Sequence, residues 1–312
     1  MQKRYKLIDK RLITEGSQID FNLFLPNETK TSMSLFLQSH RAVDADAKVK
    51  LREIEMLYVR EEDEARYKAY VERHIQSVVQ NGALSTEQKG RLIYEKAAES
   101  IDAMFKNPES LENVKNAEPV VKSFIDIILH DKSAVESLMH ITAHDYYTHT
   151  HSINVSIYTL SLGSFLGITG KDLEALGMAA ILHDLGKSKV DYSIINKNGK
   201  LTDVEFDQMK KHPALGHAIA LELGISDERI LTGIRHHHER IEGGGYPDNL
   251  RGGQISQFAR IIGVCDVFDA LSTKRSYKDP MSSFESLRLM KQQMAEHLDI
   301  GMVDAFIRML HK

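Results

Sequence analysis

The sequence predicts an α+β protein in which a small β-rich N-terminal domain precedes an all-α helical bundle. In roughly the first sixty residues, short segments rich in β-branched and aromatic side chains are separated by Gly, Asn and Pro, which is typical of strands. From Gly82 onward, apolar residues recur at helical spacing, with Asn, Gly, Ser or Pro at the joints. Because 312 residues are many for a single hydrophobic core, we expect two unequal domains, over residues 1–80 and 82–312.

The composition is typical of a globular protein and excludes several classes of partner. Apolar residues make up 42% and charged residues 27%, and a net charge of -4 without a basic face argues against a nucleic-acid polymer as partner. The single cysteine, Cys265, excludes an internal disulfide and is expected in the core. No run reaches the roughly twenty apolar residues that span a bilayer, and the N-terminus lacks the apolar core of a signal peptide. We therefore expect a cytoplasmic protein without a membrane span.

The elements of the N-terminal module follow from its local patterns. Alternation and turn residues predict strands at Tyr5 to Ile13, Ile19 to Leu25 and Ser32 to Leu37, with a further candidate at Leu51 to Val59. The highly charged stretch from Glu61 to Val79 has apolar residues at a spacing of three to four, which predicts a connecting helix.

The helical part opens with a capping box, in which Ser85 and Gln88 begin a helix that runs to Phe105. Apolar spacing and joint residues predict further helices at Val120 to Leu129, Val135 to Met139, Tyr146 to Gly167, Leu173 to Leu185, Pro213 to Leu223, Ile225 to His238 and the apolar segment Phe258 to Leu271. The glycine-rich stretch from Glu239 to Gln254 predicts an ordered loop, because Tyr246 before Pro247 is unusual in a linker. The alternative is a flexible glycine-rich turn.

The stretch from Ala180 to Lys187 carries the strongest chemical signal. It places His183 beside Asp184 in an otherwise apolar run, and a buried carboxylate is costly unless a cation or several donors meet it. Eleven of the fifteen histidines lie between His130 and His238. These observations predict a metal ion or a dense polar network.

The candidate ligands lie at helix ends or inside apolar helices: His151, His183, Asp184, His212, His237, His238 and Asp266. Imidazole and carboxylate ligands suit Fe, Mn and Zn, and the absence of thiolates argues against a structural zinc site. Seven ligands are too many for one ion. If two ions share Asp184, each has four protein ligands and room remains for a bridging water, which is the arrangement of two-metal phosphoester hydrolysis.

Several motifs occur in order along the chain: Tyr147-Thr148 before His151-Ser152, His183-Asp184-x-Gly186-Lys187, His212-Pro213, His237-His238-Glu239-Arg240, Gly245-Tyr246-Pro247, Asp266 and Arg275-x-x-Lys278. Together they resemble the HD-GYP domain, a branch of the HD phosphohydrolase superfamily, over Asp145 to Met309. The resemblance implies a helical HD-type catalytic domain with cyclic di-GMP phosphodiesterase activity. Such enzymes open the ring to linear pGpG and often continue to GMP.

The resemblance also implies a role for each matching residue. One ion, iron or manganese, would be held by His151, His183, Asp184 and Asp266, and a second by Asp184, His212, His237 and His238. It makes Asp184 and Lys187 the catalytic residues, with Lys187 stabilising charge at the scissile phosphate. Tyr246 would contact the substrate, while Arg275 and Lys278 would clamp its second phosphate. For Lys187, the alternative without a catalytic role is a lysine that offsets a helix dipole. For Arg275 and Lys278, the alternative is a solvated charge pair that binds nothing.

Some positions depart from the family pattern. Ser276 stands where the family often has Pro, and we expect this change to be tolerated. Glu242 and Gly244 also replace more usual residues and are expected to loosen the glycine-rich loop without removing a ligand. Some members hold a third ion with an acidic residue four positions before the first histidine, and Tyr147 stands there. A neutral phenol is a poor ligand for a hard cation, and Asp145 is two residues further away, so we expect two ions per chain.

Three functions remain open on the sequence alone. The first is a cyclic di-GMP phosphodiesterase, the second an HD phosphohydrolase acting on another cyclic dinucleotide or nucleotide, and the third a module that senses the dinucleotide or recruits a partner without turnover. A complete ligand set weighs against the third. The N-terminal module has no matching motif, so its regulatory role and any signalling partner are implied only by position. The helix from Thr86 to Phe105 is a candidate homodimer contact.

Overall fold

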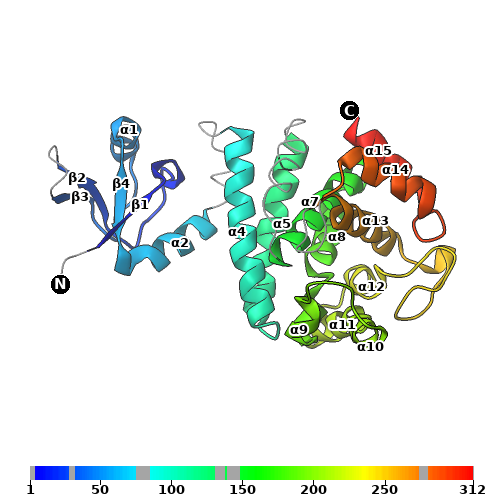
Figure 1. The fold of residues 1–312 in the computed structure, drawn as a ribbon. Coiled ribbons are helices and arrows are strands. Elements are labelled where there is room, and N and C mark those ends of the chain that lie inside the picture. Colours follow the sequence, from blue (N-terminus) through cyan, green and yellow to red (C-terminus); the bar gives the residue numbers. More distant parts are fainter. Residues whose placement is uncertain are drawn as a thin grey trace. The chain divides into compact units, whose positions relative to one another are not determined.

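The computed structural model describes residues 4–27, 32–74, 85–130, 138, 148–273 and 280–311. The chain forms two compact units, Met1–Lys89 and Gly90–Lys312. Within the described ranges, every strand belongs to the first unit, while helices make up the second (Figure 1). The α+β fold class predicted from the sequence is confirmed.

The N-terminal unit is built on a four-stranded antiparallel sheet with the strand order β1-β4-β2-β3. The strands are β1 (Tyr5–Ile8), β2 (Leu23–Pro26), β3 (Met33–Leu37) and β4 (Leu57–Arg60). The first predicted strand ends early, because Lys10–Leu12 form a 3-10 helix that Asp9 caps by accepting from the Arg11 amide.

The predicted strand from Leu51 to Val59 is wrong over its first residues, which end helix α1 (Ala45–Glu53). Asp44 caps this helix by accepting a hydrogen bond from the Ala47 amide. The cap and the following run of Ala, Lys, Leu and Arg favour a helix strongly enough to override the β-branched pattern beyond it.

Helix α2 (Glu64–Arg73) confirms the central part of the predicted connecting helix, and the expected continuation beyond His74 lies outside the described residues. Tyr70 on this helix is fully buried, and its hydroxyl lies 2.9 Å from the Thr14 amide nitrogen and 2.6 Å from Ser17 Oγ. Its ring packs edge-on against Phe21. The first unit thus has its own hydrophobic core.

The helical part of the chain begins with the predicted capping box, which is confirmed: Ser85 accepts from Gln88 N at 3.2 Å, and Gln88 accepts from Ser85 N at 3.1 Å. Its helices are α4 (Thr86–Lys106), α5 (Leu111–His130), α7 (Thr148–Phe165), α8 (Gly170–Leu182), α9 (Tyr192–Ile195), α10 (Asp203–Met209), α11 (His212–Glu222), α12 (Glu228–His236), α13 (Gln257–Ser272), α14 (Ser283–Gln293) and α15 (Ile300–Leu310). Apart from Leu138, the helix expected at Val135 to Met139 lies outside the described residues.

The core of this unit sits around α7, α8 and α13. Helix α7 is buried on almost every side, and Gly177 on α8 lets the neighbouring helices approach closely. A Cβ added there would lie 2.6 Å from Val121 and 2.8 Å from Leu160, so α8 packs tightly against α5 and α7. This packing brings residues far apart in sequence to one place.

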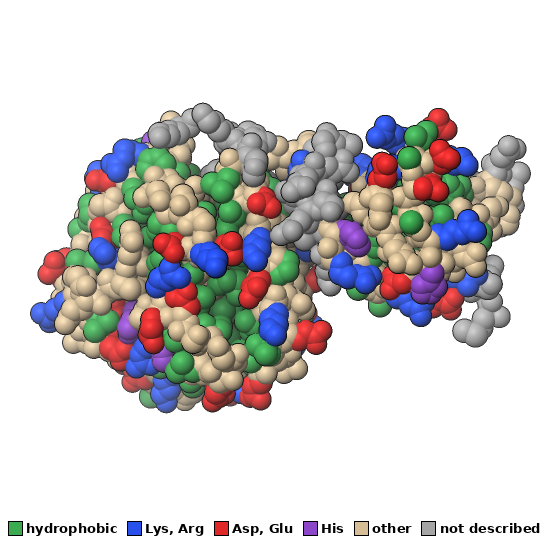
Figure 2. All heavy atoms as spheres, turned by 180° about the vertical axis from the view of Figure 1, so that it is seen from behind, with side chains coloured by type: hydrophobic (Ala, Val, Ile, Leu, Met, Phe, Trp, Pro, Cys, Tyr) green, Lys and Arg blue, Asp and Glu red, His purple; other side chains and the backbone are tan. Residues whose placement is uncertain are grey.

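The one face of the molecule that Figure 2 draws carries charges of both signs. On the face drawn in Figure 2, acidic and basic side chains are interspersed among hydrophobic ones. Within the described ranges, no helix combines the length and apolar character that crossing a lipid bilayer requires.

Candidate metal centre

Five helices direct the predicted ligands toward one another. His151 lies in the first turn of α7 and His212 begins α11, whereas His183, with Asp184, and His237, with His238, directly follow α8 and α12. Asp266 comes from the middle of α13. Three overlapping groups have ligand atoms within 4.8 Å of one another: His212, His237 and His238; His151, His183 and Asp266; and His183, Asp184 and His237.

Three of these histidines have a fixed tautomer. The Nδ1 atoms of His183, His212 and His237 lie 2.6, 2.8 and 2.8 Å from the carbonyl oxygen three residues earlier. A carbonyl only accepts, so Nδ1 donates and each neutral ring keeps a lone pair on Nε2. Burial lowers the pKa of both His183 and His237, which keeps these two rings neutral.

These unprotonated Nε2 atoms face other hydrogen-bond acceptors. His212 Nε2 lies 3.3 Å from His237 Nε2 and 3.2 Å from Asp184 Oδ1. Neither contact can be a good hydrogen bond when both atoms present lone pairs, and Asp184 Oδ1 and His183 Nε2 are buried without a hydrogen-bond partner. Buried acceptors that face one another are costly unless a cation sits among them, so this donor set fits a metal ion.

The part of the centre around His151 also favours a positive charge, because three carboxylates lie close to this ring. His151 Nε2 lies 3.1 Å from Asp266 Oδ1 and 3.5 Å from Asp184 Oδ2, and its Nδ1 lies 2.7 Å from Asp269 Oδ2. Burial opposes a charged ring, but Asp266 and Asp269 outweigh it and raise the pKa of His151 to about 9. Either a proton or a metal ion can supply the charge these carboxylates demand.

Asp184 occupies the middle of the cluster. Its Oδ2 faces His151 and His183, each at 3.5 Å, whereas its Oδ1 faces His212. Burial works against its charged form, yet the Lys187 ammonium holds the pKa of Asp184 well below its usual range. Lys187 Nζ, from a 3-10 helix over Leu185–Lys189, lies 2.5 Å from Asp184 Oδ2.

Aromatic rings border the centre beside His238. The Tyr246 ring lies 4.8 Å from the His238 ring at an interplanar angle of 33°, and the Phe206 ring lies 6.5 Å from Tyr246. Burial lowers the pKa of His238 to about 3 and raises the pKa of Tyr246, so both rings stay neutral near pH 7. Phe206 is 45% exposed, and Lys210 Nζ lies 5.2 Å from its ring centre.

The glycine-rich loop is ordered, as the sequence predicts. The buried carboxylate of Glu239 accepts from the Asp248 amide at 2.7 Å and from the Leu250 amide at 2.9 Å. A Cβ on Gly245 would lie 2.5 Å from Glu239 Cα and 2.6 Å from Arg240 N, so only glycine lets the chain fold back this closely. The loop is therefore tied to the residue that follows the ligand pair at the end of α12.

The structure brings together all seven predicted ligands with Lys187 and Tyr246. Arg275 and Lys278 lie outside the described residues, as do Tyr147 and Asp145. Sequence reasoning did not identify Asp269 or Asn154, and it named Glu239 in a motif without giving it a role. Asp269 stands one helical turn beyond Asp266 in an apolar helix, and this i, i+3 spacing was a signal for it.

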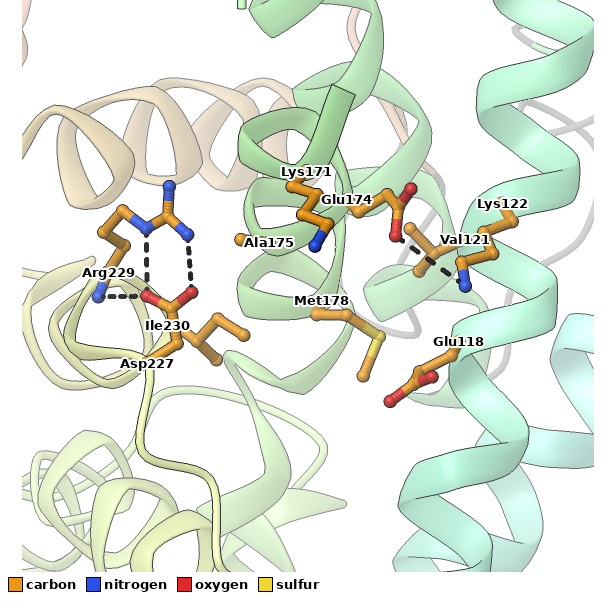
Figure 3. A pocket seen from close by; sticks show the side chains of 10 residues that line it. All are labelled: Glu118, Val121, Lys122, Lys171, Glu174, Ala175, Met178, Asp227, Arg229 and Ile230. Carbon is orange, nitrogen blue, oxygen red and sulfur yellow. Dashed lines mark hydrogen bonds and ion pairs between the residues drawn. The ribbon is translucent and has the colours of Figure 1, made fainter. Parts of the chain in front are cut away.

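A second hollow, away from the centre, lies between α5, α8 and α12 (Figure 3). Its volume is about 270 Å³, just below the roughly 300–1,000 Å³ common for ligand pockets. Lys122 and Glu174 pair across it at 3.7 Å, and Arg229 pairs with Asp227 at 2.6 Å. With these charges satisfied by one another, it offers less chemistry than the histidine cluster.

Comparisons with known proteins agree on the family. A model described as HD domain matches residues 125–301. The chain is 33% identical over 219 residues to a cyclic di-GMP phosphodiesterase of Pseudomonas aeruginosa, covering 70% of this chain and 53% of that protein. It is 40% identical over 148 residues to a cyclic di-GMP phosphodiesterase response regulator of Xanthomonas campestris, covering 46% and 38%.

Another relative carries a different substrate in its name. The 3'3'-cGAMP-specific phosphodiesterase 3 of Vibrio cholerae is 36% identical over 160 residues, covering 51% of this chain and 34% of that protein. The chain thus spans 34% to 53% of the length of these three relatives.

A solved structure shares the fold of the whole chain. The HDG"Y"P protein of Bdellovibrio bacteriovorus matches with a TM-score of 0.69 and 20% sequence identity, covering 99% of this chain and all of that one. At this identity the match concerns the fold alone, a mostly helical domain with a small N-terminal sheet. From the family match and the sequence relatives together, the chain belongs to the HD domain family and is related to the HD-GYP cyclic di-GMP phosphodiesterases.

Proposed function

We propose that this protein is a metal-dependent phosphodiesterase that hydrolyses cyclic di-GMP to pGpG. The observation that carries the proposal is a buried group of acceptor atoms: His212 Nε2 faces both His237 Nε2 and Asp184 Oδ1, and Asp184 Oδ1 has no hydrogen-bond partner. Two of the relatives described above are named for cyclic di-GMP hydrolysis, which supports this substrate. We assign catalysis to residues 82–312 and a regulatory role to residues 1–80.

The two oxygens of Asp184 support a pair of ions that share this residue. Oδ2 faces His151 and His183, which with Asp266 would hold one ion. Oδ1 faces His212, which with His237 and His238 would hold the other. When bound, two divalent ions, iron or manganese, would supply a nucleophilic hydroxide at neutral pH and neutralise charge on the phosphoryl oxygens.

The chain's own residues bind and orient the substrate. The Tyr246 ring and the half-exposed Phe206 ring offer faces on which a guanine base can stack beside the centre. We also propose that Arg275 and Lys278 hold the second phosphate, because a dianionic cyclic dinucleotide presents two phosphates and a guanidinium binds phosphate in a bidentate manner.

A turnover assay tests the substrate. Protein reconstituted with manganese or iron(II) is given cyclic di-GMP and 3'3'-cGAMP separately, and products are separated by chromatography. We expect faster hydrolysis of cyclic di-GMP, with pGpG as the first product. The cGAMP-specific relative makes cGAMP the second candidate substrate, and faster cGAMP hydrolysis would favour it. Tight dinucleotide binding by metal-loaded protein without any product would indicate a sensing module instead.

Replacing Lys187 with methionine should lower kcat about 100-fold and leave KM within a few-fold, because the ammonium acts on charge that develops in the transition state. Its side chain is 22% exposed, so it reaches the open edge of the centre. Lys189→Met is the matched control, since Lys189 on the same 3-10 helix pairs with Glu109. Both constants, kcat and KM, are measured by steady-state kinetics on samples with equal metal content. A rise in KM alone would move Lys187 to a binding role.

A further inference from the structure

A buried chain of hydrogen bonds connects α4 with His151. The Tyr94 hydroxyl on α4 donates to Asn154 Oδ1 on α7 at 2.8 Å, and Asn154 Nδ2 donates to Asp269 Oδ1 on α13 at 2.9 Å. Asp269 Oδ2 then accepts from His151 Nδ1 at 2.7 Å, while Thr273 Oγ1 donates to Asp269 Oδ1 at 2.9 Å. All five side chains are buried, so water does not compete for these bonds.

In this series of hydrogen bonds, the donor and the acceptor of each bond follow from the chemical groups present. The carboxylate of Asp269 only accepts, so Asn154 must turn its amide nitrogen toward Asp269 and its oxygen toward Tyr94. For the same reason His151 must carry its proton on Nδ1. When an ion replaces the proton on His151 Nε2, the lone pair of this atom lies beside Asp266 and Asp184, as a metal ligand requires.

The groups that orient the His151 ring differ from those that orient other ligand histidines. Nδ1 of His183, His212 and His237 bonds a carbonyl three residues earlier in the chain, so local backbone orients each ring. The orientation of His151 depends instead on side chains from three helices, α4, α7 and α13. Any displacement of one of these helices changes the bonds that hold this ring.

We propose that Asp269, Asn154 and Tyr94 are positioning residues for His151, and that they couple α4 to one half of the metal centre. This inference rests on the proposed metal centre. Because the division between the two compact units, after Lys89, falls in the first turn of α4, a change in this helix is a route by which the N-terminal unit can act on the ion beside His151. The ion beside His237 and His238 does not depend on these bonds.

Metal affinity, measured without turnover, tests the coupling. Protein is equilibrated with graded free manganese, and bound metal per chain is measured by elemental analysis. Asp269→Asn should weaken one of the two ions about 10- to 100-fold and leave the other at its wild-type affinity. Tyr94→Phe keeps the ring, removes only the hydroxyl and should weaken the same ion by less. Tyr70→Phe is the matched control, because it removes a buried phenol hydroxyl from the N-terminal unit.

The outcomes separate the two proposals. If wild-type protein binds no metal, the proposed function fails. If wild-type protein binds two ions and both Asp269→Asn and Tyr94→Phe bind them with unchanged affinity, the coupling is wrong while the proposed function stands. Equal weakening of both ions would also overturn the coupling, because it would indicate a general structural role for these residues.

Discussion

Replacing His183 and Asp184 together with alanine should abolish phosphodiester hydrolysis, remove one bound ion and weaken the binding of the other. Asp184 is the proposed shared ligand, with one oxygen facing each half of the centre, and His183 belongs to two of the three ligand groups. Loss of both therefore takes two protein ligands from one ion and one from the other. With the pair of ions incomplete, the proposed hydroxide nucleophile does not form, so the rate should fall to the detection limit.

The measurement is turnover of cyclic di-GMP together with metal content of the same samples. His217→Ala is the control, because His217 lies on α11 outside the three ligand groups. This control should keep both its metal and its activity. Hydrolysis by the double variant at an undiminished rate would place the active site elsewhere.

Replacing Gly186 with alanine should destabilise the protein by about 3 kcal/mol or more. A Cβ at this position would overlap the carbonyl oxygen of His212 and the amide nitrogen of Gly216, both of which are backbone atoms that no rotamer change can move. The 3-10 helix that carries Lys187 would have to separate from α11, which carries His212. The loss should appear in urea denaturation followed by circular dichroism.

Gly253→Ala is the matched control for this substitution. A Cβ on Gly253 meets no atom within 4 Å, so its stability should change by less than about 0.5 kcal/mol. Equal stability of the Gly186 and Gly253 variants would contradict the close packing of the 3-10 helix on α11.

The sequence predicted the residues of the buried histidine and aspartate cluster because a charged residue in an apolar run can be recognised without a structure. His183 beside Asp184 in an apolar run, and Asp266 in another, could not be explained as solvated side chains. The helices that carry them were also predictable, since apolar spacing and caps such as Ser85 with Gln88 act locally. A similar cap, Thr202 with Glu205, begins α10, and it was a local signal for a helix that the sequence reasoning overlooked.

What the sequence could not predict depends on tertiary packing. Asn154 and Tyr94 look like ordinary helix residues, and only the close packing of α7 on α13 brings Asn154 to Asp269. The pairing of Lys187 with Asp184 likewise requires the tight 3-10 turn after α8. Helix α1 was mistaken in part for a strand because the apolar residues that follow it obscured the Asp44 cap.

A titration of activity against bound metal tests the account most directly. Chelator-treated protein receives increasing equivalents of manganese under anaerobic conditions, and cyclic di-GMP hydrolysis is measured at each step. The dinuclear centre predicts no activity without metal and a plateau at two equivalents per chain. Full activity in the chelator-treated protein, or a plateau that needs three equivalents, would contradict a two-ion centre built around Asp184.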